Sequence, residues 1–233
     1  MSQDILQEQF FETLINGDRP AARSLVERTL GQGASPEQVI SDLFWPTYDL
    51  IERLYRGDQL TRMSHHLSTR LLRVLVDQMA ARLEPEALHE KSVLAFCGPS
   101  EGEELGAQMA VDILESKGYR VRFAGGGIAN DEILAQVHET KPDILLMFAP
   151  AASDLPNIRQ LIDTLQEIGA CPNMRFVVAA GVFNRAEGLA EEIGADLWAT
   201  SPRDLIDVLT NEPERRAESE QRTVGRKRRK KAA

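Results

Sequence analysis

A short acidic segment, GPSEGEELG at residues 98–106, holds the residues whose types and spacing point most directly to chemistry. Two glycines, a proline and a serine predict a loop, and Glu101, Glu103 and Glu104 stand where a helix is expected to begin. A glycine-rich turn between a strand and a helix commonly binds phosphate, because the helix N-terminus offers free N–H donors and a positive dipole end. Three carboxylates would repel such an anion, so a metal ligand and a helix cap are the remaining interpretations.

Helix capping explains the acidic residues of this segment without any ligand. Ser100 and Glu103 have the spacing of a capping box, and glutamates in a first turn complement the helix dipole. We therefore expect Glu103 to stabilise the start of the helix rather than to bind a metal.

Two adjacent histidines, His65 and His66, form the second group of candidates. On a helix, neighbouring side chains diverge by about 100°, so only one of the two can face a binding pocket. A histidine packed into a helical bundle without any ligand is an equal alternative. The sequence contains no dinucleotide-binding fingerprint, Walker loop or hydrolase elbow, and we expect no catalytic activity.

The chain divides near residues 84–91, and the part before them has helical periodicity. Ser35 followed by Pro36 predicts a capped helix start, and Pro46 predicts a kink or a boundary within the helical stretch 39–55. Four or five helices in this length predict a small helical bundle over residues 1–88.

The second part, expected over residues 91–212, alternates apolar runs with helical patterns. Strands are predicted at 92–97, 119–124, 143–149, 174–180 and 196–200. Helices are predicted at 103–117, 130–140, 156–168, 185–194 and 203–210. This alternation is typical of an α/β domain with a parallel sheet covered on both faces, in which ligands bind beyond the carboxyl ends of the strands.

The charge of the chain is unevenly distributed. The net charge is −9, but residues 214–233 carry nine basic and three acidic side chains. We expect residues 213–233 to be a disordered tail that contacts a polyanion weakly and without sequence preference, through a run of six basic residues, Arg226, Lys227, Arg228, Arg229, Lys230 and Lys231.

Composition predicts where the protein acts. No apolar run is long enough to cross a membrane, the first residues lack the pattern of a signal peptide, and Cys97 and Cys171 lie far apart. We therefore expect a cytoplasmic protein without a membrane contact, and its acidic body with a basic tail predicts a protein partner or a homo-oligomer.

A helical bundle followed by a five-stranded flavodoxin/Rossmann-like domain resembles the cobalamin-binding module of corrinoid methyltransferases and of light-sensing, cobalamin-dependent repressors. The resemblance covers roughly residues 5–210. Its most specific parts are PTYDLIERLYRGDQLTRMSHHLSTRLL, which looks like the helical cap of that family, and EEIGADLWA, which looks like its closing turn.

The resemblance assigns cofactor-binding roles to particular positions. The Asp-x-His-x-x-Gly motif of the family, whose histidine ligates cobalt, falls on residues 101–106, which places Glu101 at the aspartate, Glu103 at the histidine and Gly106 at the glycine. The tryptophan of the cap falls on Tyr55. The Glu-His pair of the cap falls on His65 and His66, of which the resemblance favours His66.

The sheet side of the same site is assigned in the same way. The Ser-x-Leu motif falls on Phe148-Ala149-Pro150, so Phe148 stands where the family inserts the nucleotide tail of the cofactor. The Gly-Gly pair falls on Ala179 and Ala180, with Gly181 directly after. A carboxylate is a weaker ligand than an imidazole for cobalt in a macrocycle, and added side-chain volume is poorly tolerated in a packed site. These changes disfavour histidine-ligated cobalamin.

Three functions follow from this comparison. The first is a non-enzymatic sensor or regulatory signalling module with an altered pocket, which the sequence favours. The second is a receptor for cobalamin or another tetrapyrrole, bound between the cap and the strand ends in a different mode. The third is a corrinoid methyl-carrier subunit, against which the missing histidine argues most strongly.

Overall fold

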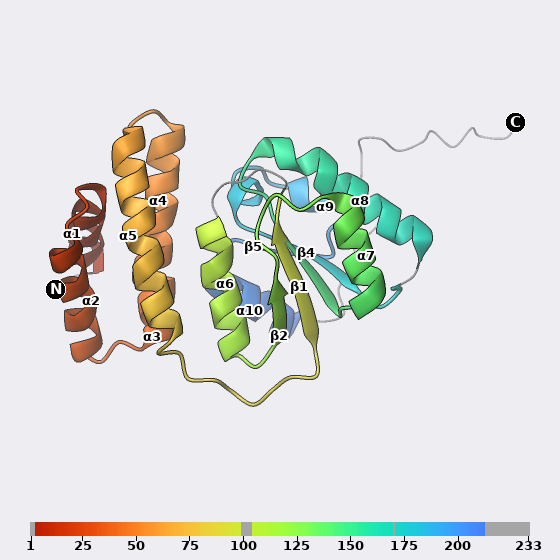
Figure 1. The fold of residues 1–233 in the computed structure, drawn as a ribbon, viewed down its shortest axis with the longest axis horizontal. Helices are drawn as coiled ribbons and strands as arrows, with labels where there is room; N and C mark the ends of the chain where they lie inside the picture. The colour runs from red at the N-terminus through yellow and green to blue at the C-terminus, as the bar shows by residue number, and fades with distance from the viewer. Residues whose placement is uncertain (1–2, 99–103, 170, 213–233) are drawn as a thin grey trace, which may run out of the picture. The chain divides into compact units, whose positions relative to one another are not determined.

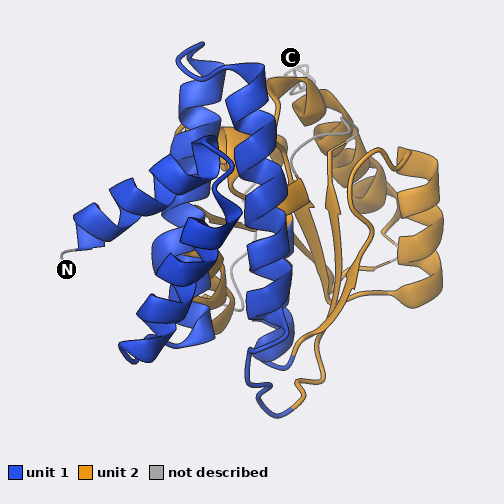
Figure 2. Cartoon of the chain, turned by 60° about the vertical axis from the view of Figure 1, so that its left-hand side comes forward, with its two compact units in different colours: residues 1–87, 108–118 blue, residues 88–107, 119–233 orange. Residues whose placement is uncertain are grey.

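The computed structural model describes residues 3–98, 104–169 and 171–212. They form two compact units, one of residues up to 87 together with 108–118, and one of residues 88–107 together with those from 119 on (Figure 2). The helix α6 (Glu104–Ser116) therefore begins in the second unit and ends in the first. None of the helices in the described part is long and apolar enough to cross a membrane.

The first unit is the predicted helical bundle. Its elements are α1 (Gln3–Ile15), α2 (Arg19–Gly31), the short α3 (Pro36–Gln38), a π-helical turn (Val39–Phe44), α4 (Trp45–Arg56) and α5 (Arg62–Ala80). Apolar side chains fill the interior, and the rings of Phe10 and Phe44 stack with their centres 5.3 Å apart. This close-packed interior fixes how α4 presents its polar residues.

The helix starts of the bundle follow the predicted signals. The side chain of Ser35 accepts a hydrogen bond from the backbone of Gln38, whose own side chain accepts one from Ser35. Pro46 lies in the first turn of α4, directly after the π-helical turn, so it marks a boundary between helical segments. A proline in a first turn removes no helical hydrogen bond, which explains why the chain tolerates it there.

The second unit is a five-stranded parallel sheet in the order β2-β1-β3-β4-β5 (Figure 1). The strands are β1 (Ser92–Cys97), β2 (Arg120–Phe123), β3 (Ile144–Phe148), β4 (Arg175–Ala179) and β5 (Leu197–Ala199). This order is flavodoxin-like, and the predicted fold class is confirmed. Each observed strand lies within its predicted range.

The helices of the second unit are α7 (Asn130–Thr140), α8 (Leu155–Ile168), α9 (Leu189–Ile193) and α10 (Pro202–Asn211). Helices α7, α8 and α9 pack with one face of the sheet in a common apolar core. The helix predicted at 185–194 is shorter than expected, because Gly188 has a left-handed φ of 77° and the residues before it form a 3-10 turn, Gly181–Asn184.

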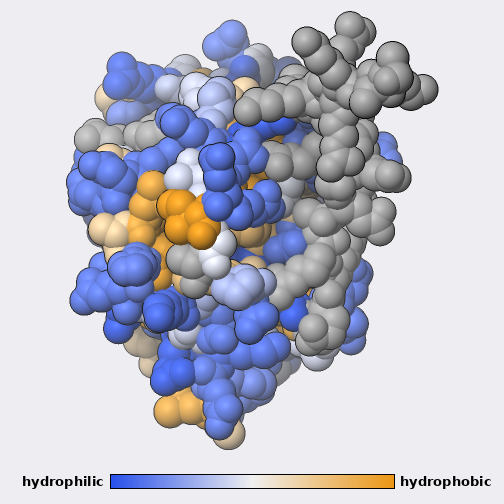
Figure 3. Space-filling view, turned by 90° about the vertical axis from the view of Figure 1, so that its right-hand side faces the viewer, coloured by the Kyte–Doolittle hydropathy of each residue, from blue (hydrophilic) through white to orange (hydrophobic). Residues whose placement is uncertain are grey.

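The described surface exposes few large hydrophobic side chains. The face seen in Figure 3 is mostly hydrophilic, with a small group of hydrophobic residues between polar ones. Among the described residues, the exposed large hydrophobic side chains are Ile5, Met63, Leu67, Leu88 and Ile168. Single exposed apolar residues of this kind are normal for folded proteins and need no ligand to explain them.

Candidate functional site

A buried pair of polar side chains joins α4 to α5 in the helical unit. The Nε2 atom of His65 lies 2.7 Å from Oε1 of Glu52, and the two residues are only 8% and 3% exposed. A buried carboxylate is costly unless it has a close hydrogen-bonding partner. The pair therefore fixes the orientation of the His65 ring within the bundle.

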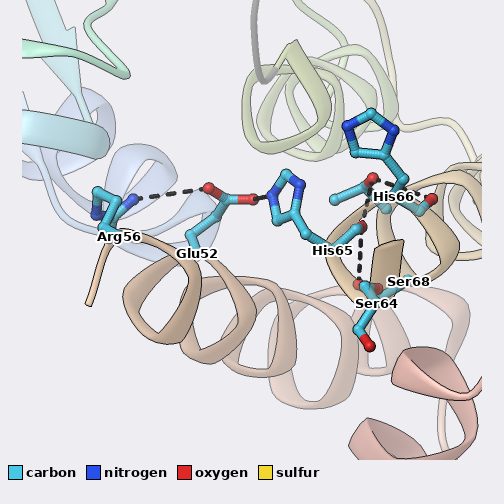
Figure 4. Close-up of polar contacts among 7 residues, drawn as sticks. Glu52, Arg56, Ser64, His65, His66 and Ser68 are labelled. Carbon is cyan, nitrogen blue, oxygen red and sulfur yellow. Dashed lines mark hydrogen bonds and ion pairs between the residues drawn. The ribbon is translucent and has the colours of Figure 1, made fainter. Parts of the chain in front are cut away.

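Tyr55 and Arg56 complete this group, which we call the Glu52–His65 cluster. The rings of Tyr55 and His65 are stacked, with their centres 3.9 Å apart and their planes inclined by 16°. Nη1 of Arg56 lies 3.7 Å from the second carboxylate oxygen of Glu52 (Figure 4). The half-buried ring of Tyr55 thus lies against the ring of His65, and the carboxylate of Glu52 holds His65 in place.

The two adjacent histidines have different surroundings, as their divergence on a helix requires. His65 points toward Glu52, whereas His66 points away from it and is exposed (Figure 4). The expected cofactor contact of His66 stays a prediction, and its exposure leaves the ring accessible.

The carboxyl ends of four strands place a row of side chains next to one another on the same face of the sheet. The register pairs Cys97 with Phe148, Phe148 with Ala179, and Ala179 with Ala199. We call these four residues the strand-end row. Each is less than 5% exposed, so the phenyl ring of Phe148 is buried in a row of otherwise small residues.

The turn after β4 has a backbone conformation that side chains rarely adopt. Ala180 has φ 56° and ψ −163°, a region populated almost entirely by glycine, and Gly181 has φ 59°. An added Cβ at Gly181 would clash with the carbonyl oxygen of Ala149, which also accepts a hydrogen bond from Val182 N–H at 2.8 Å. The two positive-φ positions are thus 180 and 181, whereas Ala179 is a regular residue of β4.

The one described glutamate of the acidic segment reaches a neighbouring loop. Oε1 of Glu104, in the first turn of α6, accepts a hydrogen bond of 2.8 Å from the backbone N–H of Gly126. Gly125 has a left-handed φ of 75°, which favours glycine there, and an added Cβ would lie 2.7 Å from the same oxygen. The carboxylate therefore uses one backbone donor of the Gly125–Gly127 loop, the N–H of Gly126, that an anionic ligand would otherwise need.

The rest of the acidic segment is only partly described. Glu101, Glu103 and the capping box predicted for Ser100 lie outside the described residues. Gly106 is buried within α6. At the start of the same segment, the backbone N–H of Gly98 donates a hydrogen bond of 2.8 Å to the carbonyl of Phe148. A Cβ added at Gly98 would clash with the buried side chain of Asp154.

The contacts at Gly98 and Gly181 limit the space for a cofactor tail at the carboxyl ends of the strands. The resemblance places the nucleotide tail beside Phe148 and the glycine pair, but Phe148, Ala179 and Ala180 are 4%, 3% and 8% exposed. Gly181 is in close contact with the backbone of the chain itself, not with open space. The described residues at these positions therefore do not fit an inserted nucleotide.

A second polar group belongs to the helical unit. Asp112 of α6 is 7% exposed, and burial raises its pKa to about 6, although a hydrogen bond of 2.5 Å from Gln108 opposes the shift. It lines a cavity of about 210 Å³ with Ala80, Leu83, Pro85, Glu115 and Ser116. Charge repulsion from Glu115 and Asp77 adds to the upward shift.

Sequence reasoning missed three residues that shape these regions, namely Glu52, Glu104 and Asp154. The only available signal for Glu52 was a charged residue inside an apolar helical stretch, LIERLY, three positions before Tyr55. Glu104 was noted only as one of three acidic residues. Asp154 gave no signal, because its contact with Gly98 joins segments distant in the chain.

Comparison with known families matches the two units separately. The family model described as "B12 binding domain" matches residues 91–206, and a second model with the same description matches residues 6–79. Together the two matches span most of the chain in the order that the sequence predicts.

Individual relatives are distant but similar in length. Dimethylamine corrinoid protein 1 of Methanosarcina acetivorans is 20% identical over 208 residues, covering 88% of this chain and 96% of that protein. Trimethylamine corrinoid protein 2 of Methanosarcina mazei is 21% identical over 193 residues, covering 81% and 87%.

A solved structure supports the fold. The monomethylamine corrinoid protein of Methanosarcina barkeri superposes with a TM-score of 0.77 at 15% identity, covering 89% of this chain and 98% of that one. With the two family matches and the flavodoxin-like sheet order, these likenesses establish that the chain belongs to the B12-binding domain family, with a helical cap and a Rossmann-like domain.

Proposed function

We propose that this chain is a corrinoid-binding carrier subunit, which presents its cofactor to a separate methyltransferase and catalyses no reaction itself. The observation that carries the proposal is the match in length. The chain covers 96% and 87% of two relatives named as corrinoid proteins, and those matches leave little of either relative without a counterpart here.

The comparisons change the order of the three hypotheses. The sequence favours a sensor and ranks the carrier last, because Glu103 replaces the ligand histidine. The relatives are named as corrinoid proteins of methylamine systems, and none of these names mentions sensing or regulation. The names of the relatives therefore support a carrier and not a sensor. The receptor hypothesis, like the carrier hypothesis, requires that the chain binds a corrinoid.

Each unit has its own candidate residues for contact with the corrinoid. In the helical unit, Tyr55, His65 and exposed His66 are the candidates, and Glu52 fixes the orientation of the His65 ring. In the second unit, the candidates are the backbone near Gly106 and the acidic pair Glu101 and Glu103, whereas the backbone of Gly181 is already in contact with Ala149. None of the carboxylates supplies the nitrogen ligand of the family motif. We propose that no nitrogen of this chain ligates the cobalt, and that His65 and His66 contact the corrinoid away from the metal.

Retention of hydroxocobalamin tests the proposed function. The purified protein is incubated with an excess of the compound, passed through gel filtration, and analysed for cobalt per protein chain. We expect a ratio near one for the wild-type chain and a clear loss for His66→Ala. His138→Ala is the matched control, because this second exposed histidine lies on α7 and should leave the ratio unchanged. A wild-type ratio below about one tenth would reject the carrier and the receptor together.

A further inference from the structure

We propose, on the basis of the corrinoid-binding function above, that this chain binds its corrinoid with the nucleotide tail outside the sheet. It therefore takes tail-less corrinoids as well as complete cobalamin, and the side chain of Phe148 is the main group that excludes the tail. The inference rests on the strand-end row and on the turn after β4, both within the second unit.

Phe148 is packed firmly within the sheet. Its backbone is held on both sides, by β1 through Cys97 and by β4 through Ala179, so the residue cannot turn out of the sheet. Its ring is 4% exposed, and its neighbours in the strand-end row, Cys97 and Ala179, are both small. Interiors are packed as densely as organic crystals, so a flat heterocycle could enter this row only by displacing the phenyl ring.

The backbone of the turn after β4 leaves no room for a ligand beside it. Gly181 permits close approach, but the group that approaches it is the carbonyl of Ala149, in the segment after β3. The Val182 N–H donates to the same carbonyl. A ligand that used the space beside Gly181 would have to break this contact between two segments.

Two backbone N–H groups at this edge of the sheet already have partners within the protein. Glu104 occupies the N–H group of Gly126, and the N–H of Gly98 donates to the carbonyl of Phe148. These backbone donors are thus used within the protein, which leaves them unable to hold the phosphate and ribose of a tail without losing an existing bond.

The test compares hydroxocobalamin with aquocobinamide, a corrinoid that ends before the nucleotide. Dissociation constants are measured for the full chain by absorbance titration. We expect them to agree within about tenfold, because the tail adds no contact with the sheet. A preference for cobalamin above about tenfold overturns the inference while leaving the proposed function intact. Failure of both compounds to bind rejects the proposed function as well.

Substitutions at two phenylalanines test whether the side chain of Phe148 excludes the nucleotide tail. Phe148→Ser should raise the affinity for hydroxocobalamin relative to aquocobinamide by about tenfold or more, because it opens space beside Ala179. Phe176→Ser is the matched control, since Phe176 is also buried, near the opposite end of β4, and should leave the ratio unchanged. The same ratio in both variants would overturn the role of Phe148. If Phe148→Ser does not fold, judged by circular dichroism, Phe148→Val replaces it with the same expectation.

Discussion

The helical unit buries a polar pair, because Glu52 of α4 lies 2.7 Å from His65 of α5. The strand ends bury apolar side chains instead, among them Phe148 and Ala179. A buried polar group requires a partner, whereas an apolar side chain requires only space. The two regions are therefore held by different forces, a hydrogen bond between two helices in one and close packing in the other.

The largest effect is expected from emptying the strand-end row. Phe148→Ala should lower the free energy of unfolding by about 3–5 kcal/mol, because it removes a buried ring and leaves a cavity among small neighbours. Urea denaturation measures the change. An effect below about 1 kcal/mol would show that the ring is not packed in the sheet, and the contrast between the two regions would fail.

Breaking the Glu52–His65 cluster should cost less. Glu52→Ala should lower the free energy of unfolding by about 2–3 kcal/mol, because it removes the carboxylate partner of a buried imidazole. Glu52→Gln should cost less than Glu52→Ala, since an amide oxygen can still accept a hydrogen bond. Glu8→Ala is the control, because Glu8 is exposed on α1 and should change stability by less than about 0.5 kcal/mol. Equal effects of Glu52→Ala and Glu8→Ala would contradict the cluster.

Asp112 is a buried carboxyl group whose hydrogen bond comes from a neutral side chain, the amide of Gln108. Its pKa is about 6 in the folded protein against an ordinary value of 3.8, so the folded state holds the proton more tightly. This contribution to stability is fully present below pH 3.8 and is lost as the pH rises to about 6.

Asp112→Asn should therefore raise the melting temperature at pH 8 and have little effect at pH 4, with a gain of about 1 kcal/mol once solvent in the cavity is allowed for. Thermal unfolding at the two pH values measures it, with the exposed Asp207→Asn as control. A larger gain at pH 4 than at pH 8 would mean that the pKa is lowered, not raised.

The smallest effect concerns the strained turn. Ala180→Gly should stabilise the protein by about 1 kcal/mol or less, because relief of the positive φ is partly offset by the greater freedom of glycine in the unfolded chain. Gly181→Ala should act in the opposite direction, since its Cβ would clash with Ala149. Melting temperatures that move in the same direction for the two variants would contradict this description of the turn.

Most of the fold could be predicted from the sequence because its signals are local. Buried strands appear as short apolar runs, and Ser35-Pro36 carries a complete capping signal, which the structure confirms. The π-helical turn before Pro46 was not predicted, since no residue type encodes it. The helix after β4 was predicted too long because Gly188 can adopt either a helical or a left-handed backbone.

The candidate site was less predictable because its contacts join distant segments. His65 and Glu52 are thirteen positions apart and on different helices, and only the packing of α4 against α5 brings them together. The positive φ of Ala180 is equally invisible, because alanine rarely adopts it and only the contact between Gly181 and Ala149 imposes the turn. Family resemblance supplied the positions, but the chemistry at each position depended on the surrounding structure.

We propose that this chain binds a corrinoid without a protein nitrogen on the cobalt. Electron paramagnetic resonance tests it most directly, on the protein loaded with hydroxocobalamin and reduced to the divalent cobalt state. The splitting from an axial nitrogen depends on the nuclear spin of that nitrogen. We predict identical spectra for the ordinary protein and for protein labelled throughout with the heavy nitrogen isotope. A splitting pattern that changes on labelling would place a nitrogen of this chain on the cobalt and contradict the account.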